Sequence, residues 1–142
     1  MNFLNEINNK RKQGLKIGFT ASTFDLLHCG HCIMLEESKM HCDFLIVGLL
    51  TDPTKDRPKT KMKPKQTTFE RWVQAVSMAD IDMVIPFDTE EDLINIIQII
   101  EPDIRFVGEE YKGKNFTGYD LPIEIYYNKR KHNYSSTKLK NN

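Results

Sequence analysis

The segment His28-Cys29-Gly30-His31 has the residue types and the spacing that are best suited to chemistry in this chain. It directly follows a predicted strand at 15–20 and opens a predicted helix at 30–40, where the helix dipole is positive. Two histidines three residues apart can donate hydrogen bonds to one anion, and Gly30 has no side chain to obstruct a phosphate approaching the backbone. The segment therefore predicts a triphosphate-binding site.

The same residues permit two other kinds of chemistry. Cys29-Gly30-His31-Cys32 is a C-x-x-C at a predicted helix start, which is typical of dithiol oxidoreductases. A helix N-terminus favours a thiolate as readily as a phosphate, so this alternative stays open, although it explains neither His28 nor the lysine-rich loop described next. A zinc site is disfavoured, because four ligands within five residues cannot all reach one tetrahedral metal.

A long cationic loop is predicted at 51–68, with the sequence TDPTKDRPKTKMKPKQTT. It carries three prolines and six lysine or arginine residues against two aspartates. Long loops in compact domains are usually functional or disordered. A charge run of this kind is usually a solvated linker, and we expect this of Lys63 and Lys65.

The elements around these residues alternate between strand and helix. Strands are predicted at 15–20, 44–50, 83–86, 104–108 and 123–127, and helices at 30–40, 69–79, 90–100 and from Ser135 onward. Such alternation predicts a single-domain α/β protein with a Rossmann-like, doubly wound, five-stranded parallel sheet, in which ligands bind beyond the carboxyl ends of the strands. The domain is expected to span 15–142, after an N-terminal extension at 1–14 that forms a helix or a tail. Trp72, Val73 and Val76 are expected to face the core.

Length and composition narrow the class of protein. A chain of 142 residues suits one domain, and its balance of 20 basic and 20 acidic residues offers no general attraction to nucleic acid or to an anionic membrane. No stretch approaches the roughly 18 apolar residues of a membrane span, and residues 1–14 do not resemble a signal peptide. An odd count of three cysteines argues against a disulfide framework. We therefore expect a cytoplasmic protein with reduced thiols.

Motifs in order along most of the chain resemble the small cytidylyltransferases typified by glycerol-3-phosphate cytidylyltransferase, which are HxGH nucleotidyltransferases. The resemblance runs from about Ile17 to Lys140. It rests on Thr23-Phe24-Asp25-Leu26-Leu27-His28-Cys29-Gly30-His31, Leu45-Ile46-Val47-Gly48-Leu49, Thr51-Asp52, Lys59, Lys61, Glu70-Arg71, Val84-Ile85-Pro86, Gly108-Glu109-Glu110-Tyr111, Gly113-Lys114, Arg130 and Ser135-Ser136-Thr137.

The resemblance implies transfer of CMP from CTP to a phosphorylated alcohol, with glycerol 3-phosphate as the best guess. The products would be a CDP-alcohol and pyrophosphate. It also implies Mg²⁺ as cofactor, a homodimer, and no nucleic-acid or membrane partner. The implied catalytic residues are His28, His31, Lys59, Lys61 and Arg130. The implied nucleotide-binding residues are Thr23, Phe24, Gly30, Gly108, Glu110, Ser135 and Ser136. Asp25 and Asp52 would contact the acceptor.

Departures from the family pattern leave the acceptor open. Ser22 occupies the place of a family glycine before Thr-Phe-Asp, and Ala79 the place of a family arginine. An adenylyltransferase of related fold is the main alternative, because base choice depends on backbone contacts that the sequence does not reveal. A non-catalytic nucleotide sensor would keep the same residues. A nucleic-acid binder is disfavoured by the neutral net charge.

Overall fold

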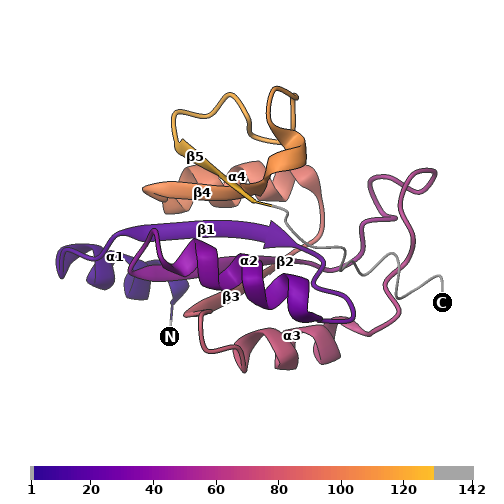
Figure 1. Ribbon diagram of the computed structural model, residues 1–142, viewed down its shortest axis with the longest axis horizontal. Coiled ribbons are helices and arrows are strands. Elements are labelled where there is room, and N and C mark those ends of the chain that lie inside the picture. The colour runs from indigo at the N-terminus through magenta and orange to yellow at the C-terminus, as the bar shows by residue number, and fades with distance from the viewer. Residues whose placement is uncertain (1, 130–142) are drawn as a thin grey trace.

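A computed structural model describes residues 2–129 of the chain as a single α/β domain (Figure 1). The helices and strands, in order, are α1 (Phe3–Lys12), β1 (Ile17–Ser22), α2 (Cys29–Lys39), β2 (Phe44–Leu50), α3 (Thr68–Val76), β3 (Met83–Phe87), α4 (Glu90–Ile100), β4 (Ile104–Gly108), the 3-10 turn η1 (Glu109–Tyr111) and β5 (Glu124–Asn128). The predicted strands and helices are confirmed to within a few residues. The predicted final helix from Ser135 lies outside the described residues.

The five strands form one parallel sheet in the order β3-β2-β1-β4-β5. The chain moves outward from β1 to β3 on one side, and then returns to the other side of β1 to add β4 and β5. This reversal places a topological switch point between β1 and β4. The predicted Rossmann-like, doubly wound sheet is confirmed.

The central strand β2 shows why the sheet is buried on both faces. Leu45, Val47 and Leu49 belong to the hydrophobic cluster under α2 and α3. Phe44 and Ile46 face the opposite cluster, which α1 and α4 cover. Successive strand residues point to opposite faces, so the continuous apolar run of β2 supplies both halves of the core.

The first fourteen residues contain a helix rather than a loose tail. Ile7 of α1 is buried in the cluster with Ile17 and Ile100. Arg11 donates hydrogen bonds from Nη2 to the carbonyls of Ile100 (2.7 Å) and Glu101 (3.0 Å) at the end of α4. These contacts satisfy carbonyls that a helix C-terminus leaves without partners in the helix. The extension therefore packs against the sheet in this structure.

Helix α3 presents a different face from the one that the sequence predicts. Trp72, Val73 and Val76 are exposed, whereas Arg71 and Ala75 are buried. The expectation that the three apolar residues face the core is wrong, because the buried side of α3 is taken by an arginine that binds carbonyls of neighbouring loops. The apolar side faces outward from the sheet.

Within residues 2–129, no helix has the length and apolar character needed to cross a membrane.

Candidate functional site

The candidate site lies at the switch point, where the backbone pairing of β1 with β4 ends before either strand does. Sheets of this topology bind their ligands in a crevice at such a point. The pairing of β1 with β4 extends over Gly18 with Ile104 and Phe19 with Arg105, while β4 continues to Gly108. One residue further along β1, the Thr20 hydroxyl donates to the carbonyl of Phe106 (3.1 Å). The ends of the two strands thus lie at the place where such sheets bind nucleotides.

The loop from β1 to α2 has an unusual backbone. Phe24 and Leu26 both have positive φ angles, of 51° and 52°. Left-handed backbone is costly for such residues and is concentrated at functional sites. Phe24 is almost fully buried, and its ring centroid lies 5.6 Å from that of His31. The loop is therefore held in a defined shape directly before the two histidines.

His28 and His31 form an interlocked cap at the start of α2. His28 Nδ1 accepts from the backbone N–H of Gly30 (3.0 Å), and His31 Nδ1 accepts from the backbone N–H of His28 (3.2 Å). His28 is the N-cap residue and His31 stands three residues into the helix, so the pair forms a capping box in which imidazoles replace the usual hydroxyl and carboxylate. The ring centroids are 4.0 Å apart.

This cap determines which ring nitrogens can bind an anion. In a neutral imidazole one nitrogen accepts and the other carries the proton. Because Nδ1 of both rings accepts a backbone N–H, the assigned tautomer of each carries its proton on Nε2. Two neighbouring Nε2–H donors at the positive end of a helix dipole are suited to phosphate oxygens. The two histidines that the sequence predicts to bind phosphate therefore have defined orientations relative to the helix, and their contact with phosphate stays a prediction.

Gly30 differs in detail from its expected role. It is buried in the first turn of α2, and its N–H is engaged by the His28 cap rather than open to a ligand. The Gly30 N–H therefore already has a partner. Contact between Gly30 and the nucleotide stays a prediction.

Residues at the end of β4 form the opposite side of the crevice. Gly108 ends the strand, and Glu109 and Glu110 begin η1. The Glu110 carboxylate folds over Gly108 so closely that a Cβ at this position would collide with it. A side chain at 108 would therefore displace Glu110, which makes both residues sensitive to substitution at this point of the crevice.

The two aspartates predicted to contact the acceptor lie at the ends of neighbouring strands. Asp25 is 1% exposed, and its two carboxylate oxygens accept the backbone N–H groups of Lys65 (2.8 Å) and Gln66 (2.9 Å). Asp52 accepts from the Thr54 hydroxyl (2.6 Å) and backbone N–H (2.9 Å), and these bonds lower its pKa. Both carboxylates thus have structural partners, and acceptor binding by either stays a prediction.

Lys59 and Lys61 lie exposed in the middle of the cationic loop. The first part of this loop is attached to the start of α4, where Arg57 pairs with Glu90 (2.7 Å) and Lys55 with Asp88 (3.4 Å). The last part is attached to Asp25. The two lysines therefore sit on a short span between two fixed points, and their action on a ligand stays a prediction.

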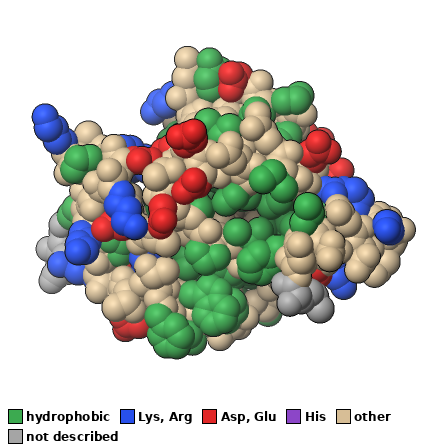
Figure 2. Space-filling view, turned by 180° about the vertical axis from the view of Figure 1, so that it is seen from behind, with side chains coloured by type: hydrophobic (Ala, Val, Ile, Leu, Met, Phe, Trp, Pro, Cys, Tyr) green, Lys and Arg blue, Asp and Glu red, His purple; other side chains and the backbone are tan. Residues whose placement is uncertain are grey.

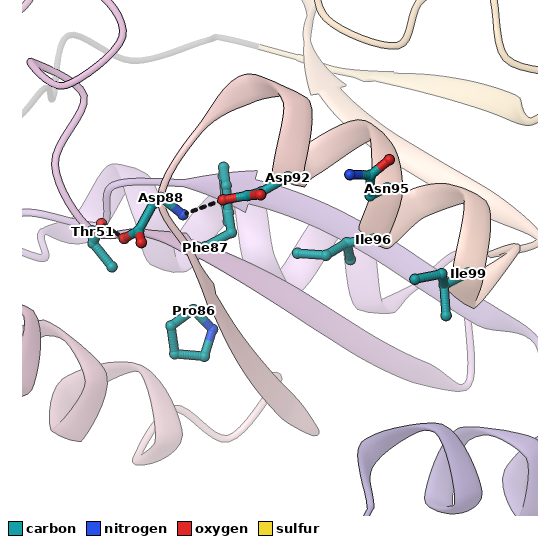
Figure 3. A pocket seen from close by; sticks show the side chains of 8 residues that line it. All are labelled: Thr51, Pro86, Phe87, Asp88, Asp92, Asn95, Ile96 and Ile99. Atoms are coloured by element: carbon teal, nitrogen blue, oxygen red, sulfur yellow. Dashed lines mark hydrogen bonds between the residues drawn. The ribbon is translucent and has the colours of Figure 1, made fainter.

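The cavity in Figure 3 lies elsewhere, on the side of the sheet that α4 covers, and has a volume of about 350 Å³. Pro86, Ile96 and Ile99 form its apolar wall, and Asp88 and Asp92 lie at one end. Asp92 accepts from the backbone N–H of Asp88 (3.3 Å). Two carboxylates repel a triphosphate, so this cavity does not suit the nucleotide.

Three further points of the sequence analysis concern the two cysteines of the C-x-x-C, a metal site and the residues after 129. Cys29 and Cys32 are free, exposed thiols on the first turn of α2. Within residues 2–129, no group of three or more histidine, cysteine or acidic side chains is arranged to hold a metal ion. The catalytic prediction for Arg130 and the nucleotide-binding predictions for Ser135 and Ser136 fall outside the described residues.

Sequence reasoning missed the role of Arg71, which is buried beside the site. Its guanidinium binds backbone carbonyls of Thr23, Leu50 and Gln66, which belong to three separate segments of the chain. The signal was an arginine within an apolar helix, directly after the capping pair Thr67 and Glu70. An arginine in that setting is either a solvated charge or the centre of a buried hydrogen-bond network.

Comparisons with known proteins assign the chain to a family. The model of the family described as cytidylyltransferase-like matches residues 19–142, which include most of β1, the two histidines and β4. The chain belongs to the cytidylyltransferase-like family. This confirms the HxGH nucleotidyltransferase superfamily, and it does not single out the glycerol-3-phosphate enzymes.

Relatives of the cytidylyltransferase-like chain include the bifunctional protein HldE of two bacteria. The chain is 40% identical over 113 residues to that of Caulobacter sp. strain K31, and 38% identical over 115 residues to that of Wolinella succinogenes. These matches cover 80% and 81% of the chain, but only 23% and 24% of the relatives. The chain therefore spans about a quarter of the curated relatives that it matches.

Solved structures share the fold. The lipopolysaccharide core biosynthesis protein from Thermoplasma volcanium GSS1 superposes with a TM-score of 0.66 at 25% identity, covering 86% of this chain and 100% of that protein. Pantothenate synthetase from Thermus thermophilus has a TM-score of 0.66 at 16% identity, covering 98% of this chain and 66% of that protein. The second likeness is one of fold alone.

Proposed function

We propose that this protein transfers the nucleoside monophosphate of a nucleoside triphosphate to the phosphate of a small phosphorylated hydroxy compound, with release of pyrophosphate. Nucleotidyltransferase activity is supported by the family match. The observation that carries the proposal is the interlocked His28 and His31 cap at the start of α2, in which Nδ1 of each ring accepts a backbone N–H and Nε2–H is therefore the donor of each ring.

In the proposed reaction, an oxygen of the acceptor phosphate attacks the α-phosphorus of the nucleotide in line. A new P–O bond forms, the bond from the α-phosphorus to the bridging oxygen breaks, and pyrophosphate leaves with the bonding electrons. No covalent enzyme intermediate is required. The protein therefore works by holding two anions together and by neutralising the charge that develops in the transition state.

Each anion-binding side chain has a separate part in this proposal. His28 and His31 bind phosphate oxygens of the nucleotide at the start of α2. Lys59 and Lys61 approach the phosphates from the cationic loop. Arg130 is proposed to supply a further positive charge to the phosphates, and Ser135 and Ser136 are proposed to bind the nucleotide. One such donor is worth on the order of 3 kcal/mol in the transition state, by analogy with oxyanion-hole donors.

Two nucleotides, CTP and ATP, are candidates for the donor. The motif resemblance and the family description favour CTP. The similarity to HldE proteins favours ATP, the donor of the adenylyltransferase alternative. Because those relatives match at 37–40% identity over most of this chain, we propose ATP as the first donor to test and CTP as the second.

The acceptor is proposed by chemical class. Glycerol 3-phosphate is the acceptor that the motif resemblance implies. The Thermoplasma volcanium protein is described as one of lipopolysaccharide core biosynthesis. For this reason we propose to test phosphorylated sugars as acceptors alongside the polyol phosphates. All these compounds present the same phosphate nucleophile to the crevice.

Mg²⁺ is proposed to arrive with the nucleotide. The described residues offer no cluster of three ligands for a metal, and both carboxylate oxygens of Asp25 are engaged by backbone N–H groups. This donor set fits a Mg²⁺ ion held chiefly by phosphate oxygens and water, as is usual for nucleotide substrates. When bound, the ion neutralises charge on the phosphates.

A homodimer is also proposed, and an apolar surface supports it. Phe69, Trp72, Val73 and Val76 of α3 and Ile99 of α4 are exposed on either side of the edge strand β3. Figure 2 shows hydrophobic side chains gathered over the middle and lower part of this side of the molecule. We name these five residues the α3/α4 surface.

The extent of the α3/α4 surface favours a second copy of the chain as its occupant. With side-chain areas of roughly 150–250 Å² for aromatics and somewhat less for aliphatics, its exposed apolar area is about 500 Å². That lies near the upper end of the ~300–600 Å² usual for the largest patch on a monomer. Together with a polar rim, it approaches the roughly 800 Å² per partner of a stable interface. Because the α3/α4 surface flanks an edge strand, the same surface of a second copy can pack against it across a two-fold axis.

Pyrophosphate release tests the proposed reaction. Purified protein with Mg²⁺ is given ATP or CTP and each member of a panel of polyol phosphates and sugar phosphates. We expect release that requires one nucleotide and one acceptor and that is lost in His28→Asn. Release that survives this change would contradict the proposed site, and the absence of release with every pair would leave the sensor hypothesis as the better account.

A further inference from the structure

Arg71 is a charged side chain that is 1% exposed in the core of the molecule. An uncompensated buried charge is very costly, so the hydrogen bonds of the guanidinium must compensate for its loss of water. Its Nη1 donates to the carbonyls of Leu50 (2.7 Å) and Thr23 (2.9 Å), and its Nε donates to the carbonyl of Gln66 (3.1 Å). Burial lowers its pKa, while the nearby charge of Asp25 acts in the opposite direction.

The carbonyls bound by Arg71 belong to segments that are far apart in sequence. Thr23 lies in the β1–α2 loop, Leu50 ends β2, and Gln66 lies just before α3. Its Nη2 also donates to the carbonyl of Thr51, at the start of the cationic loop. Arg71 therefore holds the beginning and the end of this loop beside the segment that leads to His28.

Asp25 makes the second half of the same connection. Its carboxylate accepts the backbone N–H groups of Lys65 and Gln66, and the Gln66 side chain in return accepts the backbone N–H of Leu26 (2.9 Å). The β1–α2 loop and the end of the cationic loop are thus joined by three part-buried hydrogen bonds. The two bonds to the Asp25 carboxylate are charge-assisted, which makes them the stronger ones.

These contacts fix where the lysines can reach. The cationic loop is held at Thr51 and at 65–66, and Arg57 attaches its first part to Glu90 of α4. Residues 58–64, which include Lys59 and Lys61, span the remaining distance. Residues 65–66 are bound to Asp25 of the β1–α2 loop, and Thr51 is bound to Arg71, which also binds Thr23 of that loop. The position of the two lysines is therefore tied to that of the loop that leads to His28.

We propose that Arg71 and Asp25 are positioning residues, which set nucleotide affinity by holding Lys59 and Lys61 in reach of the phosphates without touching the substrate. This inference rests on the proposed function, and it assigns Asp25 a role other than direct acceptor binding. Without the latch that these two residues form, the loop would have to be ordered at the cost of binding energy.

Two conservative variants test the latch. Asp25→Asn keeps the shape but supplies one acceptor oxygen where two N–H groups need partners, and Arg71→Lys keeps the charge but cannot serve three segments at once. Two quantities are measured well below the unfolding temperature of each variant: the rate of tryptic cleavage at 55–65, mapped by mass spectrometry, and the dissociation constants of ATP and CTP.

Arg105→Lys is the matched control. Arg105 is also buried, but its Nη1 donates to the carbonyl of Thr117, in a different loop. Lysine keeps the positive charge near Glu90, the partner of Arg57, so the substitution should reduce stability with little effect on the cationic loop. We expect cleavage at 55–65 to increase at least about tenfold in Asp25→Asn and Arg71→Lys, and to stay within about twofold of wild type in Arg105→Lys.

A coupling measurement separates positioning from general destabilisation. Replacing Lys59 and Lys61 by alanine should weaken binding of the preferred nucleotide about tenfold or more in the wild-type background, and by much less in Asp25→Asn, where the lysines are already misplaced. An equal effect in both backgrounds would overturn the proposal, as would unchanged cleavage at 55–65. These readouts do not require turnover, so a failure of the proposed transfer reaction would be seen separately.

Discussion

At the scale of single residues, the site depends on the two nitrogens of each imidazole having different tasks. Nδ1 of His28 and Nδ1 of His31 hold the start of α2 together, and the Nε2–H of each ring is the donor proposed for the ligand. The sequence predicted the pair and its place after β1. It did not predict the mutual capping, because ring orientation depends on the left-handed backbone at Phe24 and Leu26.

This division of tasks separates stability from activity at position 28. His28→Ala removes both the cap and the anion donor, and should lower the free energy of unfolding by about 1 kcal/mol. His28→Asn restores a good N-cap and should keep most of that stability. Both variants should lose roughly a hundredfold in turnover, as for a lost transition-state donor. Denaturant unfolding and pyrophosphate release measure the two effects, and an active His28→Asn would refute the assignment.

Cys42 gives the pH dependence a definite sign. Burial raises the pKa of its thiol from 9.0 to about 11. Between these values the unfolded thiol ionises while the native thiol keeps its proton, so the unfolded state gains stability and the free energy of unfolding falls as pH rises. Cys42→Ala should show a smaller fall than wild type when denaturant unfolding is compared at about pH 8 and about pH 10.5. An identical fall in both proteins would contradict this account.

At the scale of elements, the strands were predictable and the facing of helices was not. The apolar run at 44–50 is a local signal, and the strand that it predicts is confirmed. The helix predicted at 90–100 is also confirmed, and Thr89 and Asp92 form a capping box at its start. The buried face of α3 depends instead on carbonyls that come from three distant segments to meet Arg71. No periodicity within α3 carries that information, so apolar Trp72 and Val73 were wrongly assigned to the core.

Glu37 of α2 makes a second connection between elements, at the end of β5. Its carboxylate accepts from the Tyr126 hydroxyl (2.8 Å), from Asn128 Nδ2 (3.3 Å) and from the backbone N–H of Lys129 (3.2 Å). The hydrogen bond to Glu37 raises the pKa of Tyr126. The exit of β5 is thus held against α2 directly before Arg130.

Glu37→Ala should therefore loosen this exit. We expect a loss of about 1–3 kcal/mol in the free energy of unfolding, since bonds to a charged acceptor are broken and buried Asn128 loses a partner. Hydrogen exchange should increase at the backbone amides of β5 and of Lys129, while amides in β2 report only the global change. Exchange that increases equally in β2 and β5 would show that Glu37 has no local role.

At the scale of the whole molecule, the strand order determines where the site lies. The reversal after β3 leaves β1 beside β4, which places the topological switch point at the strand that leads to the histidines. The alternation of strands and helices predicted this arrangement, and the family match agrees with it. The α3/α4 surface was hidden from sequence reasoning, because its residues look like core residues until the helix orientation is known.

The proposed homodimer can be tested on that surface. Val73→Lys places a charge in the middle of the α3/α4 surface, and should convert a dimer to a monomer in sedimentation velocity experiments. Met40→Lys is the matched control, because Met40 is 76% exposed at the end of α2, away from this surface. A wild-type monomer at all concentrations, or a Val73→Lys dimer, would exclude this interface.

The most direct test of the central claim follows the α-phosphate itself. ATP or CTP carrying a radiolabelled α-phosphate is incubated with wild-type protein, Mg²⁺ and the phosphorylated acceptors, and the products are separated by chromatography. We predict that label enters a new nucleoside diphosphate conjugate, that phosphatase treatment does not remove it, and that His28→Asn forms at most about one hundredth as much. Label that stays in the nucleotide with every acceptor, or a conjugate formed equally by His28→Asn, would contradict the account.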